Sequence, residues 1–133
     1  MSFTEPEQAY LGEQRLGRIA TTSAKGEPDV APVTFTITPS GRIVIHGLDL
    51  PKTVKWRNVL ATGRAAFVVD DLATVDPWAP RGVKLRGGAA GLTDEQGRTS
   101  IEITPEVIWS WGVNPDAPKH FARMIERREV AKG

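Results

Sequence analysis

An alternation of apolar and polar residues in the middle of the chain constrains its fold most. Val33, Phe35 and Ile37 alternate with threonines, and after a turn Ile43 and Ile45 continue the pattern. A period of two residues is typical of β-strands with one buried face. The segments SAKGEPD and TPSGR supply glycine and proline for tight connections. We therefore predict a meander of three antiparallel strands formed by RIATTS, VAPVTFTIT and RIVIHG.

Four later segments predict further strands: RAAFVVDD, GVKLRGGAAGL, TSIEIT and VIWSWGV. Helices are expected from Thr4 to about Leu16, from Lys52 to Thr62, and in PKHFARMIERRE, where Phe121, Met124 and Ile125 have helical spacing. Six or seven short strands that must avoid open edges favour a closed barrel. We predict one mainly β domain over residues 1–133, with minor α structure. The alternation alone also allows an OB-fold or a lipocalin-like cup.

The composition excludes several classes of function. Seventeen basic residues against sixteen acidic ones give a net charge of +1, too balanced for a broad nucleic-acid-binding face. The absence of cysteine removes thiol nucleophiles, disulfides and thiolate metal sites, and it is compatible with a reducing cytoplasm. No segment approaches the roughly 20 apolar residues of a membrane-spanning helix. We expect a cytoplasmic protein without nucleic-acid or membrane partners.

The stretch TVKWRNVLATGRAAFVVDD, residues 53–71, combines a basic helix start with an apolar strand. Free amides of the first helical turn, the helix dipole and the Lys55 ammonium would together bind a phosphate, with Thr53 adding a hydroxyl and Asn58 beside them. Three residues of this helix would pack on the barrel: Trp56, Val59 and Leu60. The alternative interpretation is that the basic residues only solvate an exposed helix.

The remaining candidate residues give weaker signals. His46 and His120 are the only histidines and lie far apart, so the sequence indicates neither a metal site nor a catalytic base. Asp70 and Asp71 should point to opposite faces of a strand, which argues against an acid–base pair.

Two further patterns have a structural interpretation. Trp109 and Trp111 share one strand face and favour packing or a dimer contact. The glycines of LRGGAAG lack the setting of a dinucleotide site and indicate close strand packing or a bulge.

Four segments, taken together, resemble a known family: GRIATTSAKGEPDVAPVTF, TVKWRNVLATGRAAFVVDD, DPWAPRGVKLRGGA and VIWSWG. The chain is similar over nearly its whole length to the PPOX-class, coenzyme F420-dependent oxidoreductases, the B group of flavin/deazaflavin oxidoreductases. The resemblance implies a split β-barrel like that of FMN-binding proteins and pyridoxamine 5'-phosphate oxidases. It also implies a homodimer with two cofactors in grooves between the subunits.

The resemblance further implies cofactor-binding residues. Those expected at the ribityl-phosphate end are Thr53, Lys55 and Asn58. Those expected at the ring and its approach are Val33, Thr34, Gly47 and Leu48. The loop near the dimer groove would supply Trp78, Pro80 and Arg81.

One turn departs from the family pattern, because Glu27 and Asp29 stand where many relatives carry arginine and a neutral residue. These carboxylates would repel the polyglutamate tail of F420 unless a basic residue compensates. The candidates for that compensation are Lys25, Arg42 and Arg81. FMN therefore remains an alternative cofactor.

The function implied is hydride transfer between reduced F420 and a small, electron-poor unsaturated substrate, with orientation supplied by the protein and the chemistry by the cofactor. The sequence identifies no catalytic residue and no proton donor. The alternative is a carrier that binds F420, FMN or a tetrapyrrole without turnover.

Overall fold

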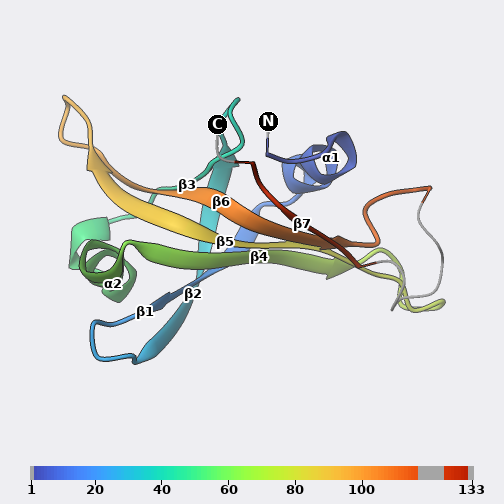
Figure 1. Ribbon diagram of the computed structural model, residues 1–133, viewed down its shortest axis with the longest axis horizontal. Coiled ribbons are helices and arrows are strands. Elements are labelled where there is room, and N and C mark those ends of the chain that lie inside the picture. The colour runs from blue at the N-terminus through green and yellow to red at the C-terminus, as the bar shows by residue number, and fades with distance from the viewer. Residues whose placement is uncertain (1, 117–124, 132–133) are drawn as a thin grey trace.

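In the computed structural model, which describes residues 2–116 and 125–131, the strands form one antiparallel sheet. In chain order the elements are α1 (Glu5–Glu13), β1 (Leu16–Thr22), β2 (Pro28–Ile37), β3 (Ile43–Ile45), the 3₁₀ helix η1 (Leu50–Lys52), α2 (Val54–Thr62), β4 (Arg64–Leu72), β5 (Pro80–Thr93), β6 (Thr99–Trp111) and β7 (Glu126–Glu129). The strand order is β3-β2-β1-β4-β5-β6-β7, and an additional β3–β6 pairing closes a barrel (Figure 1). The predicted mainly β, closed architecture is confirmed.

The alternating residues fill the interior of this barrel. Ile43 and Ile45 are fully buried, and Phe35 pairs with Ile45 across β2 and β3. Phe35 and Phe67 meet edge to face with their ring centroids 5.1 Å apart. The period of two therefore places one face of each strand in a common core and leaves the other face outside.

β6 corrects the prediction of two separate strands, TSIEIT and VIWSWGV. It is one strand with a bulge, because Gly87 pairs with Pro105 while Arg86 pairs with Val107, leaving Glu106 as an extra residue. A Cβ atom at Gly87 would collide with the main chain of β6. The bulge shifts the inward positions by one residue, so the period of two appears broken in the sequence although the strand continues.

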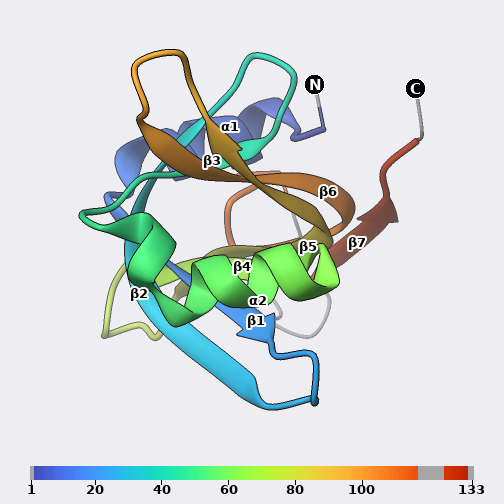
Figure 2. The same ribbon diagram turned by 90° about the vertical axis from the view of Figure 1, so that its left-hand side faces the viewer.

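The two helices cover opposite ends of the barrel (Figures 1 and 2). α1 has a capping box, in which Thr4 and Glu7 bond each other's main chains, as its predicted start required. α2 is capped by the Thr53 side chain and ends at Gly63, whose φ of 65° is the left-handed conformation that glycine adopts readily. Neither helix, of nine residues each, nor any other described helix is long and apolar enough to span a membrane.

The prediction of a C-terminal helix is wrong where the structure tests it. Residues 126–129 form β7, which pairs antiparallel with residues 107–110 of β6. Ile125 is not helical, and Phe121 and Met124 lie outside the described residues. β7 lies at the edge of the sheet, and three of its four residues are exposed.

Candidate functional site

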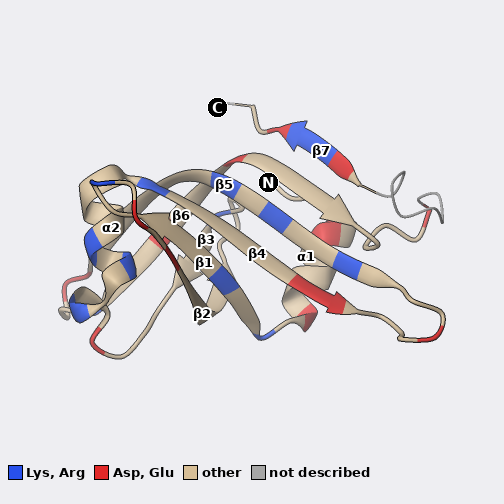
Figure 3. Ribbon diagram, turned by 90° about the horizontal axis from the view of Figure 1, so that it is seen from below, with Lys and Arg blue, Asp and Glu red and all other residues tan. Residues whose placement is uncertain are grey.

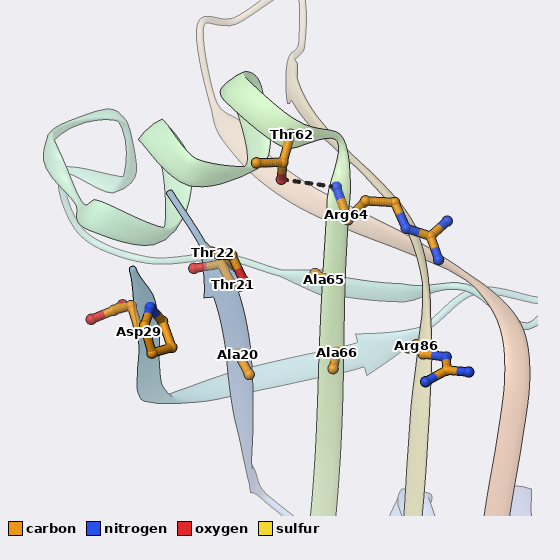
Figure 4. Close-up of a pocket in the computed structure, with 10 residues that line it drawn as sticks. Ala20, Thr21, Thr22, Asp29, Thr62, Arg64, Ala65, Ala66 and Arg86 are labelled. Carbon is orange, nitrogen blue, oxygen red and sulfur yellow. Dashed lines mark hydrogen bonds between the residues drawn. The ribbon is translucent and has the colours of Figure 1, made fainter. Parts of the chain in front are cut away.

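A cavity of about 420 Å³ opens where β1 and β4 separate (Figure 4). These strands pair only from Arg18–Val68 to Ala20–Ala66, and beyond that point they diverge beneath the end of α2. The cavity is lined by Ala20, Thr21, Thr22, Pro28, Asp29, Thr62, Arg64, Ala65, Ala66 and Arg86. The split in the barrel therefore creates a concave, accessible site on its wall.

The cavity has an apolar floor and charged sides. Ala20 and Ala66 provide small side chains between the two strands, whereas Asp29 lies on the β2 side and Arg64 and Arg86 lie on the β5 side (Figure 4). None of the lining residues is a histidine, cysteine or lysine. Such a surface can hold a flat ring and orient polar groups at its rim, so redox chemistry here has to come from a bound group.

The start of α2 keeps several donors available for an anion. Thr53 Oγ1 accepts a hydrogen bond from the Trp56 amide and donates one to the Leu50 carbonyl at 2.6 Å. Lys55 is partly exposed, and none of the carboxylates that the structure describes forms an ion pair with it. A helix N-terminus with an unpaired ammonium group has the donor set that a phosphate prefers. Lys55 therefore fits the phosphate end of a flavin-type cofactor. The Thr53 hydroxyl, which was expected to add a donor, is instead used within the turn.

Two other residues of α2 differ from the expected arrangement. Asn58 is only 3% exposed, and its Nδ2 donates to Thr21 Oγ1 at 3.0 Å, so it does not project beside the first turn. Leu60 is 62% exposed and does not pack in the core, although Val59 does. Val59 and Trp56 pack against the core as expected, and Asn58 is buried beside them because its amide finds a polar partner on β1.

The residues expected at the ring lie in the middle of β2 and in the loop after β3. Val33 belongs to the core at 7% exposure, whereas Thr34 is exposed. Gly47 and Leu48 follow β3 in an exposed loop, Leu48 being 96% exposed. Val33 and Thr34 pair with Gly17 and Leu16 at the start of β1. The side chain of Val33 points inward, so this residue could face a ligand only through its main chain.

The loop expected at the dimer groove lies at the opposite end of the same chain. Trp78 is exposed in the β4–β5 connection, and Pro80 and Arg81 begin β5. In Figure 1 this connection and α2 lie at opposite ends of the long axis. A single chain therefore does not bring Trp78, Pro80 and Arg81 to Lys55.

Arg81 is held within a polar cluster under α1. Its Nη2 lies 2.6 Å from Asp71 Oδ2, and Asp71 Oδ1 accepts a hydrogen bond from the Tyr10 hydroxyl at 2.9 Å. Hydrogen bonds from Arg81 lower the pKa of Asp71, and burial together with Asp71 raises the pKa of Tyr10. Asp70 is exposed on the opposite strand face, which confirms that the two aspartates do not form a pair.

The cations expected to compensate the acidic turn are partly occupied elsewhere. Arg42 Nη1 pairs with Glu102 at 2.7 Å, and Arg81 pairs with Asp71.

The sequence did not single out Arg64 and Arg86 as site residues. The alternation in RAAFVVDD and GVKLRGGAAGL could have identified them, because it places Arg64 and Arg86 on the outer face of their strands.

No group of three or more histidine, cysteine, aspartate or glutamate side chains among the described residues could hold a metal ion. His46 is exposed beside a hollow of about 600 Å³ formed with the β5–β6 hairpin. His120 lies outside the described residues.

The chain matches known proteins at the level of family and fold. The family model described as "Pyridoxamine 5'-phosphate oxidase" matches residues 3–112. A 5a,11a-dehydrotetracycline/5a,11a-dehydrooxytetracycline reductase of Streptomyces rimosus is 41% identical over 128 residues, which cover 87% of each chain.

Solved structures share the barrel at lower identity. A conserved hypothetical protein of Mycobacterium tuberculosis superposes with a TM-score of 0.70 and 19% identity over 84% of this chain and 86% of its own. A heme-binding protein of Mycobacterium smegmatis has a TM-score of 0.69 and 16% identity, covering 97% of this chain and 59% of its own. An FAD-binding protein of the same species has a TM-score of 0.61 and 18% identity, covering 80% and 92%. The fold is thus a split β-barrel.

Proposed function

Because this chain belongs to the pyridoxamine 5'-phosphate oxidase family, we propose that it is an oxidoreductase that transfers a hydride between coenzyme F420 and a small, electron-poor unsaturated substrate. The observation that carries this proposal is the 41% identity to a dehydrotetracycline reductase over 87% of both chains. Reduction of a 5a,11a-dehydro compound saturates one carbon–carbon double bond, which is the reaction class proposed here.

The residues present fit an anionic cofactor end at the start of α2. Lys55 and the free amides of the first helical turn would hold its phosphate, while Thr53 fixes the geometry of that turn. A bound deazaflavin would supply the hydride. The alanine floor and the hydroxyls of Thr22 and Thr62 would orient the bound groups and exclude water.

We also propose a cytoplasmic homodimer, in which the partner chain completes each cofactor groove. The separation of Trp78, Pro80 and Arg81 from Lys55 supports this, because only a second copy can bring both sets to one ligand. Trp109 and Trp111 on the outer face are the proposed contacts. Analytical ultracentrifugation tests the proposal: a monomer at micromolar concentration that binds one cofactor per chain would contradict it.

A turnover assay tests the function. Protein, reduced F420 and 5a,11a-dehydrooxytetracycline are mixed, and the absorbance of oxidised deazaflavin is followed together with the mass of the product. We expect reoxidation that depends on both protein and substrate, with a product two hydrogen atoms heavier. A parallel reaction with reduced FMN distinguishes the alternative cofactor. Tight cofactor binding without reoxidation across a panel of enones and quinones would instead support the carrier alternative.

A further inference from the structure

A second cavity, of about 400 Å³, lies under α1. Its walls are largely apolar, with Pro6 and Ala9 contributed by α1 and Val113 and Pro115 by the segment that follows β6. None of the residues that line it also lines the cavity between β1 and β4. Figure 3 shows acidic residues gathered around this end of the molecule and basic ones on α2. A small ring ligand fits a cavity of this size and character.

Arg81 is the cation that lines this cavity, and its guanidinium is fixed in place. Asp71 accepts hydrogen bonds from its Nε at 3.0 Å and from its Nη2 at 2.6 Å. Its Cζ also lies 5.1 Å from the centre of the Tyr10 ring, within the range of a cation–π contact. A two-point ion pair and an aromatic neighbour together set the plane of the guanidinium before any ligand binds.

The third nitrogen of Arg81 is available to a ligand. Nη1 lies 4.0 Å from Glu13 Oε2, which is beyond hydrogen-bond distance, and it forms no hydrogen bond with a described residue. The Glu13 side chain is 65% exposed, so its carboxylate can move away. Because Arg81 and Glu13 both line the cavity, a pre-oriented N–H donor stands beside apolar walls. Such a donor suits a carbonyl oxygen carried by a ring.

The charges around the cavity favour a cation as the rest of the ligand. Glu5 and Glu13 both line it and are exposed, and their separation of eight residues on α1 corresponds to about 12 Å along the helix. The charge of Arg81 is already matched by Asp71. Two further carboxylates therefore make the cavity attractive to an ammonium group and repulsive to a carboxylate.

We propose that the cavity under α1 binds the substrate, a ring ketone that is conjugated to a carbon–carbon double bond and carries an ammonium group. The carbonyl oxygen accepts a hydrogen bond from Arg81 Nη1, and the ammonium group lies toward Glu5. The inference rests on the proposed function, because the proposed homodimer brings Arg81 of one subunit to the cofactor groove of the other.

This placement gives Arg81 a catalytic role. A hydride adds to the β-carbon of the conjugated ketone, and the π electrons move to the carbonyl oxygen, which becomes an enolate. Nη1 donates a hydrogen bond to that oxygen while its negative charge develops, which lowers the barrier. A proton from water then binds the α-carbon, so that two C–H bonds replace one carbon–carbon π bond.

Titration calorimetry on the cofactor-free protein tests the charge preference with three ketones of matched size. They are para-(aminoethyl)acetophenone, which is a cation, para-propylacetophenone, which is neutral, and para-acetylphenylpropanoate, which is an anion. We expect the cation to bind about threefold tighter than the neutral ketone and the anion to bind more weakly than both. Glu5→Gln should remove most of this preference, whereas Glu95→Gln on the β5–β6 hairpin should keep it. Equal affinities for the three ketones in wild type would overturn the proposal.

The role of Arg81 is tested by a ligand without the carbonyl group. Arg81→Gln should weaken binding of the cationic ketone by roughly tenfold. Binding of para-ethylphenethylamine, which has an ethyl group in place of the acetyl group, should stay within about twofold of wild type. Asp71 still accepts hydrogen bonds from Tyr10 and Gln14 in this variant, and circular dichroism checks that it folds. Equal weakening of both ligands would overturn the contact between Nη1 and the carbonyl oxygen.

Filling the cavity separates failure of this site from failure of the proposed function. Ala9→Trp places a large side chain at an exposed helical position that lines the cavity, and Ala61→Trp does so at an exposed position of α2 that does not. Only Ala9→Trp should abolish ketone binding and turnover. If Ala9→Trp reoxidises reduced F420 with substrate as fast as wild type, the substrate site is overturned and the function stands. If wild type binds the cationic ketone through Arg81 but binds no deazaflavin, the proposed function falls and the ligand site stands.

Discussion

At the α1 end of the barrel the charged groups bind one another, whereas at the α2 end and on the adjoining wall several have no carboxylate partner among the described residues. Glu7 is 1% exposed, and its carboxylate accepts hydrogen bonds from Arg128 and Ser110. Asp71 binds Arg81 through two hydrogen bonds. Lys55 and Arg86, by contrast, are unpaired in the part of the chain that the structure describes.

The comparison separates charges that are bonded within the fold from cations, such as Lys55, that have no carboxylate partner among the described residues. A buried carboxylate must be fully bonded, and no described buried side-chain nitrogen or oxygen lacks a partner. A cation kept unpaired near a cavity is available to a ligand instead. Removing Glu7 or Asp71 at the α1 end should therefore change stability, whereas we expect removal of the unpaired Lys55 to change binding.

The largest expected effect is on stability. Glu7→Ala leaves Arg128 without its carboxylate and Ser110 without an acceptor, so we expect the free energy of unfolding to fall by about 3 kcal/mol. Urea denaturation followed by circular dichroism measures this. Glu102→Ala is the control, because its pair with Arg42 is more exposed and should cost less than about 1 kcal/mol. If both variants lost the same free energy of unfolding, the buried Glu7–Arg128 pair would be no more stabilising than an exposed surface pair.

Lys55→Ala should act on binding rather than folding. Loss of one charge-assisted phosphate contact should weaken cofactor binding by about 1.5–3 kcal/mol, with the unfolding midpoint nearly unchanged. Calorimetric titration of the cofactor measures the affinity, and Arg57→Ala, an exposed neighbour on α2, is the matched control. An affinity identical to wild type would show that the phosphate does not bind at the start of this helix.

Asp71→Asn should have a smaller effect that depends on pH. The pair with Arg81 is partly exposed and should contribute about 1 kcal/mol at neutral pH. Hydrogen bonds from Arg81 lower the pKa of Asp71 below 3.8, its ordinary value, so the stabilisation is present above that pH and is lost as the pH falls through the lower folded value. Thermal melts of both proteins should therefore converge in acid. A difference that grows on acidification would contradict this assignment.

His46→Ala should have the smallest effect. His46 is exposed and lies outside the lining of the cavity between β1 and β4, so both turnover and stability should stay close to wild type. Steady-state kinetics with reduced F420 checks this. A fall of several orders of magnitude in kcat with cofactor binding retained would identify His46 as a proton donor.

The alternation of Val33, Phe35, Ile43 and Ile45 predicted strands with one buried face, and the need to avoid open edges favoured a closed barrel. The split-barrel topology was implied by the family resemblance, because the alternation alone also allows an OB-fold or a lipocalin-like cup. Thr4 likewise predicted where α1 starts, whereas the second helix, expected from Lys52, begins at Val54 after the cap Thr53. The bulge at Glu106 was not predictable, since an extra residue in one strand depends on the strand opposite it.

The site was predicted less completely. Lys55 carries a local signal, a cation at a helix start, and it lies where that signal placed it. The positions of Arg86 and Asn58 depend on contacts between segments that are distant in the sequence. Arg86 on β5 contacts Trp109 on the neighbouring strand β6, and Asn58 on α2 contacts Thr21 on β1. Such pairings come from the register of the sheet, which a single sequence specifies only weakly.

On the edge opposite β5, β6 has two partners, β3 at residues 101–103 and β7 at residues 107–110, and Pro105, which has no amide hydrogen, lies between them. Hydrogen exchange of the β6 amides should therefore report two separate opening events. Amides that β6 donates to β3 exchange only when the barrel opens, whereas those donated to β7 exchange when the terminal strand detaches. The slow and fast classes within a single strand would measure the cooperativity of the barrel independently of the edge strand β7.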